Sequence, residues 1–118
     1  MVKRVEYFER LLKCKDKELI KVITGVRRCG KSTLLLMYKD YLIENGISED
    51  HIIFINFEDL DNEELTNYKA LYNFINALIK DDKKYYIILD EIQNVNEFQK
   101  TIDSLYLKKN VDIYITGL

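Results

Sequence analysis

The stretch ITGVRRCGKSTLL, residues 23–35, decides the fold of this 118-residue chain. Its core fits the pattern G-x-x-x-x-G-K-[S/T] at every fixed position. Gly25 and Gly30 allow the unusual backbone angles that turn successive N–H groups towards a phosphate chain. Lys31 adds a positive charge for the β- and γ-phosphates, and the hydroxyl of Ser32 suits a Mg²⁺ ligand. The pattern predicts a phosphate-binding loop between a strand and a helix.

The whole loop is expected to surround the phosphates of a bound nucleotide. Thr33 begins the helix, whose N-terminal partial positive charge adds to the field at the phosphates. The predicted nucleotide-binding residues are therefore Gly25, Val26, Arg27, Arg28, Cys29, Gly30, Lys31, Ser32 and Thr33.

The motif does not explain its two arginines, Arg27 and Arg28, because they occupy variable positions. In one interpretation they extend over the phosphates or over an acidic partner, which suits guanidinium geometry. Alternatively, they pair with the nearby acids Glu58 and Asp59, which we favour because surface arginines usually contact carboxylates. Cys29 between them is interpreted as a small filler without chemistry.

Strands and helices alternate on both sides of the loop. Short apolar runs predict four strands, and the first is apolar on both faces, as a buried parallel strand should be. Apolar residues at helical spacing predict helices between them, and Asn96 with Gln99 resembles a capping pair for the last helix. This alternation predicts an α/β fold, a three-layer parallel sheet with flanking helices. The predicted strands are 19–24, 51–57, 85–89 and 111–116; the helices include Val5 to Leu12, Lys31 to a cap at Asn45-Gly46, Leu71 to Leu78, and Phe98 to Leu105.

A second motif, YYIILDEIQ at residues 85–93, ends an apolar strand in Asp90-Glu91. An acid in this place, beside a phosphate loop, can hold Mg²⁺, and the next acid can activate the attacking water. A solvated pair of acids at a strand end is common by itself. Beside the phosphate loop, the pair favours a metal ligand at Asp90 and a general base at Glu91.

Together the two motifs resemble those of P-loop NTPases with an additional strand and a catalytic glutamate. The longer string IKVITGVRRCGKSTLL, INFED, YIILDEIQNV and IYITG is similar to predicted AAA-type ATPases of bacteria and archaea, which carry a C-terminal domain of unknown function. The resemblance covers nearly the whole chain. It implies ATP and Mg²⁺ as ligands, with Lys31 and Glu91 as catalytic residues and Ser32 and Asp90 at the metal.

The resemblance also implies a strand order of first, fourth, third, second, with Tyr114 and Ile115 in the middle of the sheet. Thr116 then takes the place of the polar residue that senses the γ-phosphate or orients water. Family members usually read TGS and continue, whereas this sequence reads TGL and stops at Leu118. Residues 1–118 are therefore expected to be the N-terminal part of an ATPase domain, without its lid, its arginine finger or its C-terminal domain, and so poorly active. Homo-oligomers would form through the missing part.

Composition narrows the function classes. The net charge of −2 gives no general attraction to nucleic acid or anionic membranes, and no apolar run is long enough to span a bilayer. The two cysteines, too few for a zinc cluster, favour a reducing cytoplasm. ATP hydrolysis for an unknown protein or DNA client is the leading interpretation. The alternatives are a nucleotide-gated switch or interaction module that barely hydrolyses ATP and, less favoured, a P-loop small-molecule kinase.

Overall fold

Four parallel strands and three main helices make up the described part of a computed structural model of the chain. The structure describes Glu9, Leu12, Lys13, Lys15 and residues 20–23 and 28–118. Of residues 28–32 it describes the backbone alone. The strands are β1 (Ile20–Ile23), β2 (Ile52–Asn56), β3 (Tyr85–Asp90) and β4 (Val111–Thr116), and the helices are α2 (Arg28–Glu44), α3 (Tyr68–Leu78) and α4 (Phe98–Tyr106). Short 3₁₀ turns are η1 (Glu49–His51), η2 (Leu60–Leu65) and η3 (Ile92–Asn94).

The four strands form one sheet in the order β1-β4-β3-β2, and every neighbouring pair is parallel. This order confirms the expectation from the sequence. Tyr114 and Ile115 of β4 are buried between β1 and β3. Because parallel strands end at the same edge of a sheet, the segments that follow each strand are brought together there.

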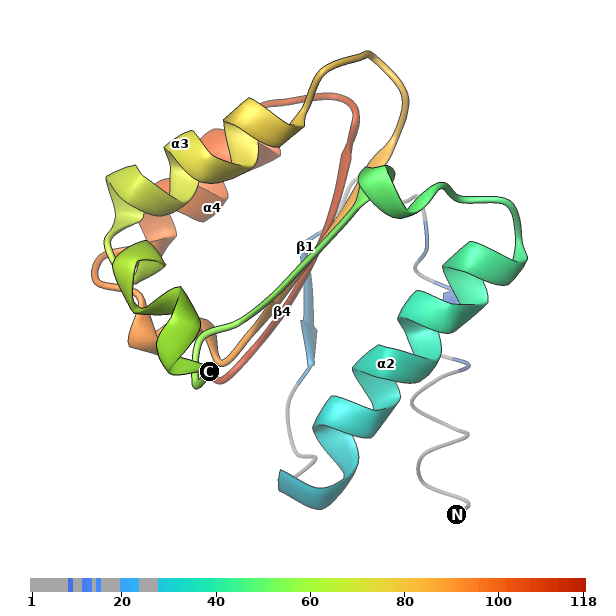
Figure 1. Cartoon of the computed structure of the whole chain (residues 1–118), viewed down its shortest axis with the longest axis horizontal. Coiled ribbons are helices and arrows are strands. Elements are labelled where there is room, and N and C mark those ends of the chain that lie inside the picture. Colours follow the sequence, from blue (N-terminus) through green and yellow to red (C-terminus); the bar gives the residue numbers. More distant parts are fainter. Residues whose placement is uncertain (1–8, 10–11, 14, 16–19, 24–27) are drawn as a thin grey trace.

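Helices cover both faces of the sheet. Helices α3 and α4 lie side by side on one face, and α2 lies on the other (Figure 1). Alternate residues of the strands supply two separate clusters, since successive side chains point to opposite faces. The α3/α4 cluster contains Leu71, Ile75, Ile87, Ile102 and Leu105, and the α2 cluster contains Leu34, Leu35, Tyr38, Leu42, Ile88 and Tyr114. The fold is therefore a three-layer α/β structure, as predicted.

Strand β1 departs from the prediction that both its faces are apolar. Lys21 is buried with 6% of its surface exposed, and Val22 is 47% exposed. Lys21 is accommodated because its ammonium group donates a hydrogen bond to the buried carboxylate of Asp112 on β4. Burial of an unpaired ammonium group would be strongly unfavourable, so this position depends on its partner.

Helix α2 ends as the sequence predicts and begins earlier. Gly46 has a φ of 91°, its N–H donates to Ile43 O (3.1 Å), and the N–H of Ile47 donates to Leu42 O (3.0 Å). These two bonds form a Schellman cap. The helix begins at Arg28 rather than Lys31. Arginine and lysine are good helix formers, and one glycine in the first turn costs only about 1 kcal/mol.

The predicted capping pair of the last helix is wrong. Helix α4 begins after Glu97, which has a φ of 54° and makes no side-chain capping bond. Asn96 lies one residue too early because it forms an isolated parallel bridge with Asn67, and its N–H donates to Thr66 O (2.8 Å). An asparagine does cap the preceding helix, α3: the side chain of Asn67 accepts hydrogen bonds from the N–H groups of Lys69 and Ala70.

Other predicted boundaries agree within one or two residues, except that α3 begins at Tyr68, three residues before the predicted Leu71. The strand predicted from His51 begins at Ile52, since His51 lies in η1, and the acidic turn after β2 forms η2 with Asp59 as its N-cap. The predicted N-terminal helix lies mostly outside the described residues, although Glu9, Leu12 and Lys13 have helical backbone. None of the helices in the described residues is long and apolar enough to cross a membrane.

Candidate nucleotide site

The candidate site lies at the edge of the sheet where all four strands end. The register places Ile23, the last residue of β1, beside Thr116, the last residue of β4. On the other side, the last residue of β2, Asn56, lies beside Asp90, the last residue of β3. The phosphate-loop sequence therefore leaves the sheet next to Thr116, close to the acidic end of β3.

Asp90 and Thr116 are held together by a buried hydrogen bond. The hydroxyl of Thr116 donates to Asp90 Oδ1 at 2.6 Å, and both side chains are almost fully buried, with 1% and 0% of their surfaces exposed. The same hydroxyl oxygen accepts a hydrogen bond from the backbone N–H of Glu91 at 2.9 Å. One threonine thus fixes both the carboxylate of Asp90 and the backbone of the following glutamate.

Glu91 has a left-handed backbone conformation, with a φ of 61°, which is uncommon for a residue other than glycine. This conformation ends β3 and turns the chain into η3. The side chain is half-buried, and Gln93 Nε2 donates a hydrogen bond to Glu91 Oε1 at 2.8 Å. The carboxylate predicted to be the general base is therefore held by a neighbouring amide.

Gly117 permits the close approach of the end of β4 to this turn. Its φ is 97°, and a Cβ atom placed there would lie 1.7 Å from Gln93 Oε1 and 3.0 Å from Glu91 Cα. A side chain at this position would displace Gln93 or the backbone of Glu91. Gln93 and Gly117 lie within the sequences YYIILDEIQ and IYITG, but the sequence pattern alone assigns neither residue a role.

The phosphate loop is described only in part. Gly25, Val26 and Arg27 lie outside the described residues, and for Arg28, Cys29, Gly30, Lys31 and Ser32 the structure describes the backbone of the first turns of α2. Thr33 is exposed on the same helix, followed by the buried Leu34. The predicted contacts of Arg27 and Arg28 with phosphates or with Glu58 and Asp59 remain predictions.

A buried network of polar side chains connects β4 with β1 and α2, the two elements on either side of the phosphate loop. The carboxylate of Asp112 accepts from Lys21 on β1 and, at 2.7 Å, from the hydroxyl of Tyr114. That hydroxyl also forms a short hydrogen bond with Tyr38 of α2. Burial and the neighbouring Tyr38 hydroxyl and Asp112 carboxylate hold the pKa of Tyr114 well above its ordinary value, so it stays protonated. No local sequence pattern indicates this network, because its members are separated by up to 91 residues.

Comparison with known proteins identifies relatives of the chain. The sequence pattern of the AAA domain family matches residues 17–117. An uncharacterized protein of Haemophilus influenzae is 39% identical over 118 residues, which covers 99% of this chain and 30% of that protein. The chain thus spans less than a third of the length of this relative. No solved structure matches the chain.

Proposed function

Because the chain belongs to the AAA domain family, we propose that it binds ATP through residues 25–33 and hydrolyses it in a Mg²⁺-dependent reaction. The observation that carries this proposal is the cluster of Asp90, Glu91 and Thr116 at the sheet edge next to the end of β1. A phosphate loop and an acidic strand end are needed side by side for ATP hydrolysis, and the strand order supports that placement.

In this proposal the loop binds the phosphate chain with its backbone N–H groups and with Lys31. Glu91 accepts a proton from the attacking water, and its location directly after the anchored Asp90 keeps it at the sheet edge. Thr116 holds the carboxylate of Asp90 and the backbone of Glu91 through its two hydrogen bonds, and so positions the residue that would receive the proton from the water. The family resemblance further implies that Thr116 senses the γ-phosphate directly.

Asp90 and Ser32 would hold the Mg²⁺ ion. The carboxylate of Asp90 is a hard oxygen donor that Thr116 fixes in one orientation, which suits the demands of Mg²⁺ for defined oxygen ligands. When bound, the ion neutralises negative charge that develops on the phosphate oxygens.

A nucleotide-gated switch with little turnover is the second candidate function. The hydrogen bond from Gln93 to Glu91 favours it, because an amide donor stabilises the charged carboxylate and so makes it a weaker base. Such a site would bind ATP and hydrolyse it only slowly until a partner protein breaks the hydrogen bond between Gln93 and Glu91. For either function, the two cysteines fit a reducing cytoplasm. For hydrolysis, an arginine from a neighbouring copy would complete the site.

Two substitutions in the intact protein test the proposal. Glu91→Gln should retain ATP affinity and lose hydrolysis by about 100-fold or more, since the amide cannot accept the proton. Asp90→Asn should weaken ATP binding in the presence of Mg²⁺. Calorimetry measures the affinity and phosphate release measures the rate.

Glu97→Gln is the matched control, because Glu97 is also a glutamate with a positive φ but lies at the start of α4. Its turnover should equal that of the wild type. If the wild type binds ATP but the Glu91→Gln variant hydrolyses it at the same slow rate, the switch function is correct instead. If the wild type does not bind ATP, both candidates are wrong.

A further inference from the structure

The outer edge of β2 carries a second feature, which is separate from the candidate nucleotide site. Strand β2 pairs with β3 on one side, and no strand of the described residues pairs with its other side. Its sequence, Ile-Ile-Phe-Ile-Asn, contains none of the lysines or prolines that usually protect an edge strand.

The backbone of β2 shows which groups face outwards. The N–H of Phe57, directly after the strand, donates to Asp90 O of β3 (2.9 Å), so the alternate residues Ile53 and Ile55 also face β3. Ile52, Phe54 and Asn56 consequently direct their N–H and C=O groups to the open side.

Two of these outward groups already have partners. The N–H of Ile52 donates to Glu49 O, and Asn56 O accepts from the side-chain amide of Asn62 at 2.9 Å. The C=O of Ile52, both backbone groups of Phe54 and the N–H of Asn56 form no hydrogen bond with any described residue. These four backbone groups recur at every second residue, as they do along the open side of an edge strand.

A groove runs along this edge. Its volume is about 420 Å³, and it is lined by β2 residues together with Phe74 and Leu78 of α3. Phe74 and Leu78 are 43% and 38% exposed, although both belong to the apolar side of an amphipathic helix. The groove therefore offers apolar contacts beside the open backbone groups, as needed by an added strand whose side chains alternate.

Acidic residues flank the groove at both ends of β2. Glu49, Asp50 and Asp81 line its first end, and Lys80 is the one cation among the lining residues. Asp59 and Asp61 follow the other end and are exposed. Acids therefore line the first end of the groove, and two exposed acids follow β2 beyond its other end.

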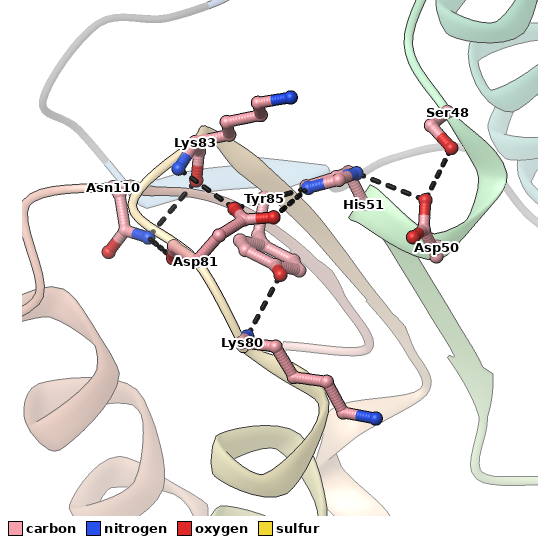
Figure 2. A network of polar contacts seen from close by, with 8 residues as sticks. All are labelled: Ser48, Asp50, His51, Lys80, Asp81, Lys83, Tyr85 and Asn110. Atoms are coloured by element: carbon pink, nitrogen blue, oxygen red, sulfur yellow. Dashed lines mark hydrogen bonds and ion pairs between the residues drawn. The ribbon is translucent and has the colours of Figure 1, made fainter.

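His51 fixes the acids at the first end, as Figure 2 shows. Its Nε2 lies 2.9 Å from Asp81 Oδ2 and its Nδ1 lies 3.1 Å from Asp50 Oδ1. The hydroxyl of Ser48 donates a further short bond to Asp50, and the N–H of Lys83 donates to Asp81 at 2.9 Å. The two carboxylates are thus held at defined positions beside the groove.

These charges disfavour a second copy of the chain as the occupant. Antiparallel pairing of two β2 strands about Phe54 would place Asp50 of one copy opposite Glu58 of the other. Parallel pairing would place identical acids side by side. Like charges directly opposite each other destabilise a strand pair, whereas a segment with basic ends complements these acids.

We propose that the outer edge of β2 binds an extended segment of another protein, in which apolar residues alternate and lysine or arginine residues flank them. The segment pairs with the open groups of Ile52, Phe54 and Asn56 and places alternate side chains against Phe74 and Leu78. Its basic ends contact the acids at the two ends of β2.

Fluorescence anisotropy of the 118-residue protein with labelled peptides tests this proposal. The probe is Lys-Arg-Val-Thr-Val-Thr-Val-Arg-Lys, with two further versions that carry Leu or Phe in place of Val. One control peptide is N-methylated at every central residue, which removes its backbone donors, and another carries Glu in place of every Lys and Arg. We expect at least one basic peptide to bind and neither control to bind.

Protein variants locate the binding surface. Phe74→Ser and the double variant Glu49→Lys/Asp61→Lys should each weaken binding by about tenfold, through lost apolar contact and reversed charge respectively. The matched controls are Leu107→Ser, at an 82% exposed leucine, and Asp40→Lys/Asp103→Lys, at two exposed acids of α2 and α4. These controls should bind like the wild type.

Three results would overturn the proposal. They are equal binding by the N-methylated or acidic peptide, no binding by any of the three basic peptides, and unchanged affinity in the Phe74→Ser variant. Sedimentation adds a fourth: a dimer that Phe74→Ser dissociates would assign the edge to a second copy. None of these measurements depends on nucleotide binding.

Discussion

At the scale of single residues, the candidate site depends on close contacts that leave no spare volume. Gly117 approaches Gln93 and Glu91 so closely that hydrogen is the only side chain that fits. Thr116, its neighbour, uses both its hydrogen and its oxygen in bonds to Asp90 and Glu91. Small changes at these positions should therefore alter the orientation of the two acids.

Gly117→Ala should lower the free energy of unfolding by more than Gly46→Ala does. Both glycines have positive φ values, so each alanine carries a backbone cost of about 1–2 kcal/mol. Around Gly46 no atom lies within 4 Å of the added Cβ, whereas at Gly117 the Cβ meets Gln93. Urea unfolding of both variants measures the difference.

The double variant Gly117→Ala/Gln93→Ala provides the control for this contact. Removing the Gln93 side chain should recover the part of the loss that comes from Gln93, whereas the contact of the added Cβ with Glu91 Cα at 3.0 Å remains. If the two single alanine variants lose the same stability, the close contact has no energetic effect.

The pair of His51 and Asp81 should make stability depend on pH. The hydrogen bond and charge of Asp81, together with Asp50, raise the pKa of His51 above its ordinary value of 6.5. A raised pKa in the folded state stabilises the protein fully below about pH 6.5, and the stabilisation is lost as the pH rises through the folded-state pKa.

The variant Asp81→Asn tests this dependence, because asparagine can still accept the bond from Lys83. The difference in unfolding free energy between wild type and variant should be largest between about pH 4.5 and 6.5 and should decrease at higher pH. Asp82→Asn, at an exposed neighbour, is the control and should show no such slope. A difference that stays constant from pH 5 to pH 9 would contradict the role of His51.

At the scale of elements, the sequence predicts the strands and helices well and their polar contacts poorly. Apolar runs predicted β4 to the residue, and the asparagine-glycine pair predicted the cap of α2. Lys21 was not recognised as a buried residue, because its partner Asp112 lies on a strand far along the sequence. Asn96 was misassigned as a cap because its bridge with Asn67 depends on packing between distant segments.

The pairing of β1 with β4 through Lys21 and Asp112 gives the prediction at this scale. Lys21→Ala should destabilise the protein by about 3–5 kcal/mol, since it leaves a buried carboxylate without its counterion. The double variant Lys21→Met/Asp112→Leu should lose less stability than Lys21→Ala, because two apolar side chains replace two buried charges, and the remaining loss should reflect the Tyr114 hydroxyl that no longer has Asp112 as its acceptor. Thermal unfolding measures both.

Lys100→Ala is the control for this pair. Lys100 contacts Glu97 at 3.0 Å, but the two side chains are 56% and 50% exposed. Its loss should change stability by about 1 kcal/mol or less. If Lys21→Ala were as mild as Lys100→Ala, the buried pair would be unimportant for the sheet.

At the scale of the whole molecule, nucleotide binding should stabilise the fold, because the proposed ligand contacts the segment that joins β1 to α2. ATP with Mg²⁺ at about a hundredfold above its dissociation constant should raise the free energy of unfolding by about 2.7 kcal/mol. Lys31→Ala should remove this increase, since the loop loses its fixed charge on the phosphates. Differential scanning fluorimetry with and without Mg-ATP measures the effect.

Lys39→Ala, on the same helix, is the control and should keep the full ligand-dependent increase. The same increase in the Lys31→Ala variant would show that ATP binds elsewhere. The sequence predicts the loop because its pattern is local, and this stays a prediction, since residues 24–27 lie outside the described residues. It could not predict the Asp90, Thr116 and Gln93 contacts, which require the folded turn after β3 and the end of β4.

The strand order also has a consequence for the timing of folding. Among the described strands the first, β1, pairs with the last, β4, and the contact between Lys21 and Asp112 spans 91 residues. Closing such a long loop is entropically unfavourable until β4 has formed against β3. During synthesis, β1 therefore lacks its neighbour in the described sheet until residues 111–116 have been made.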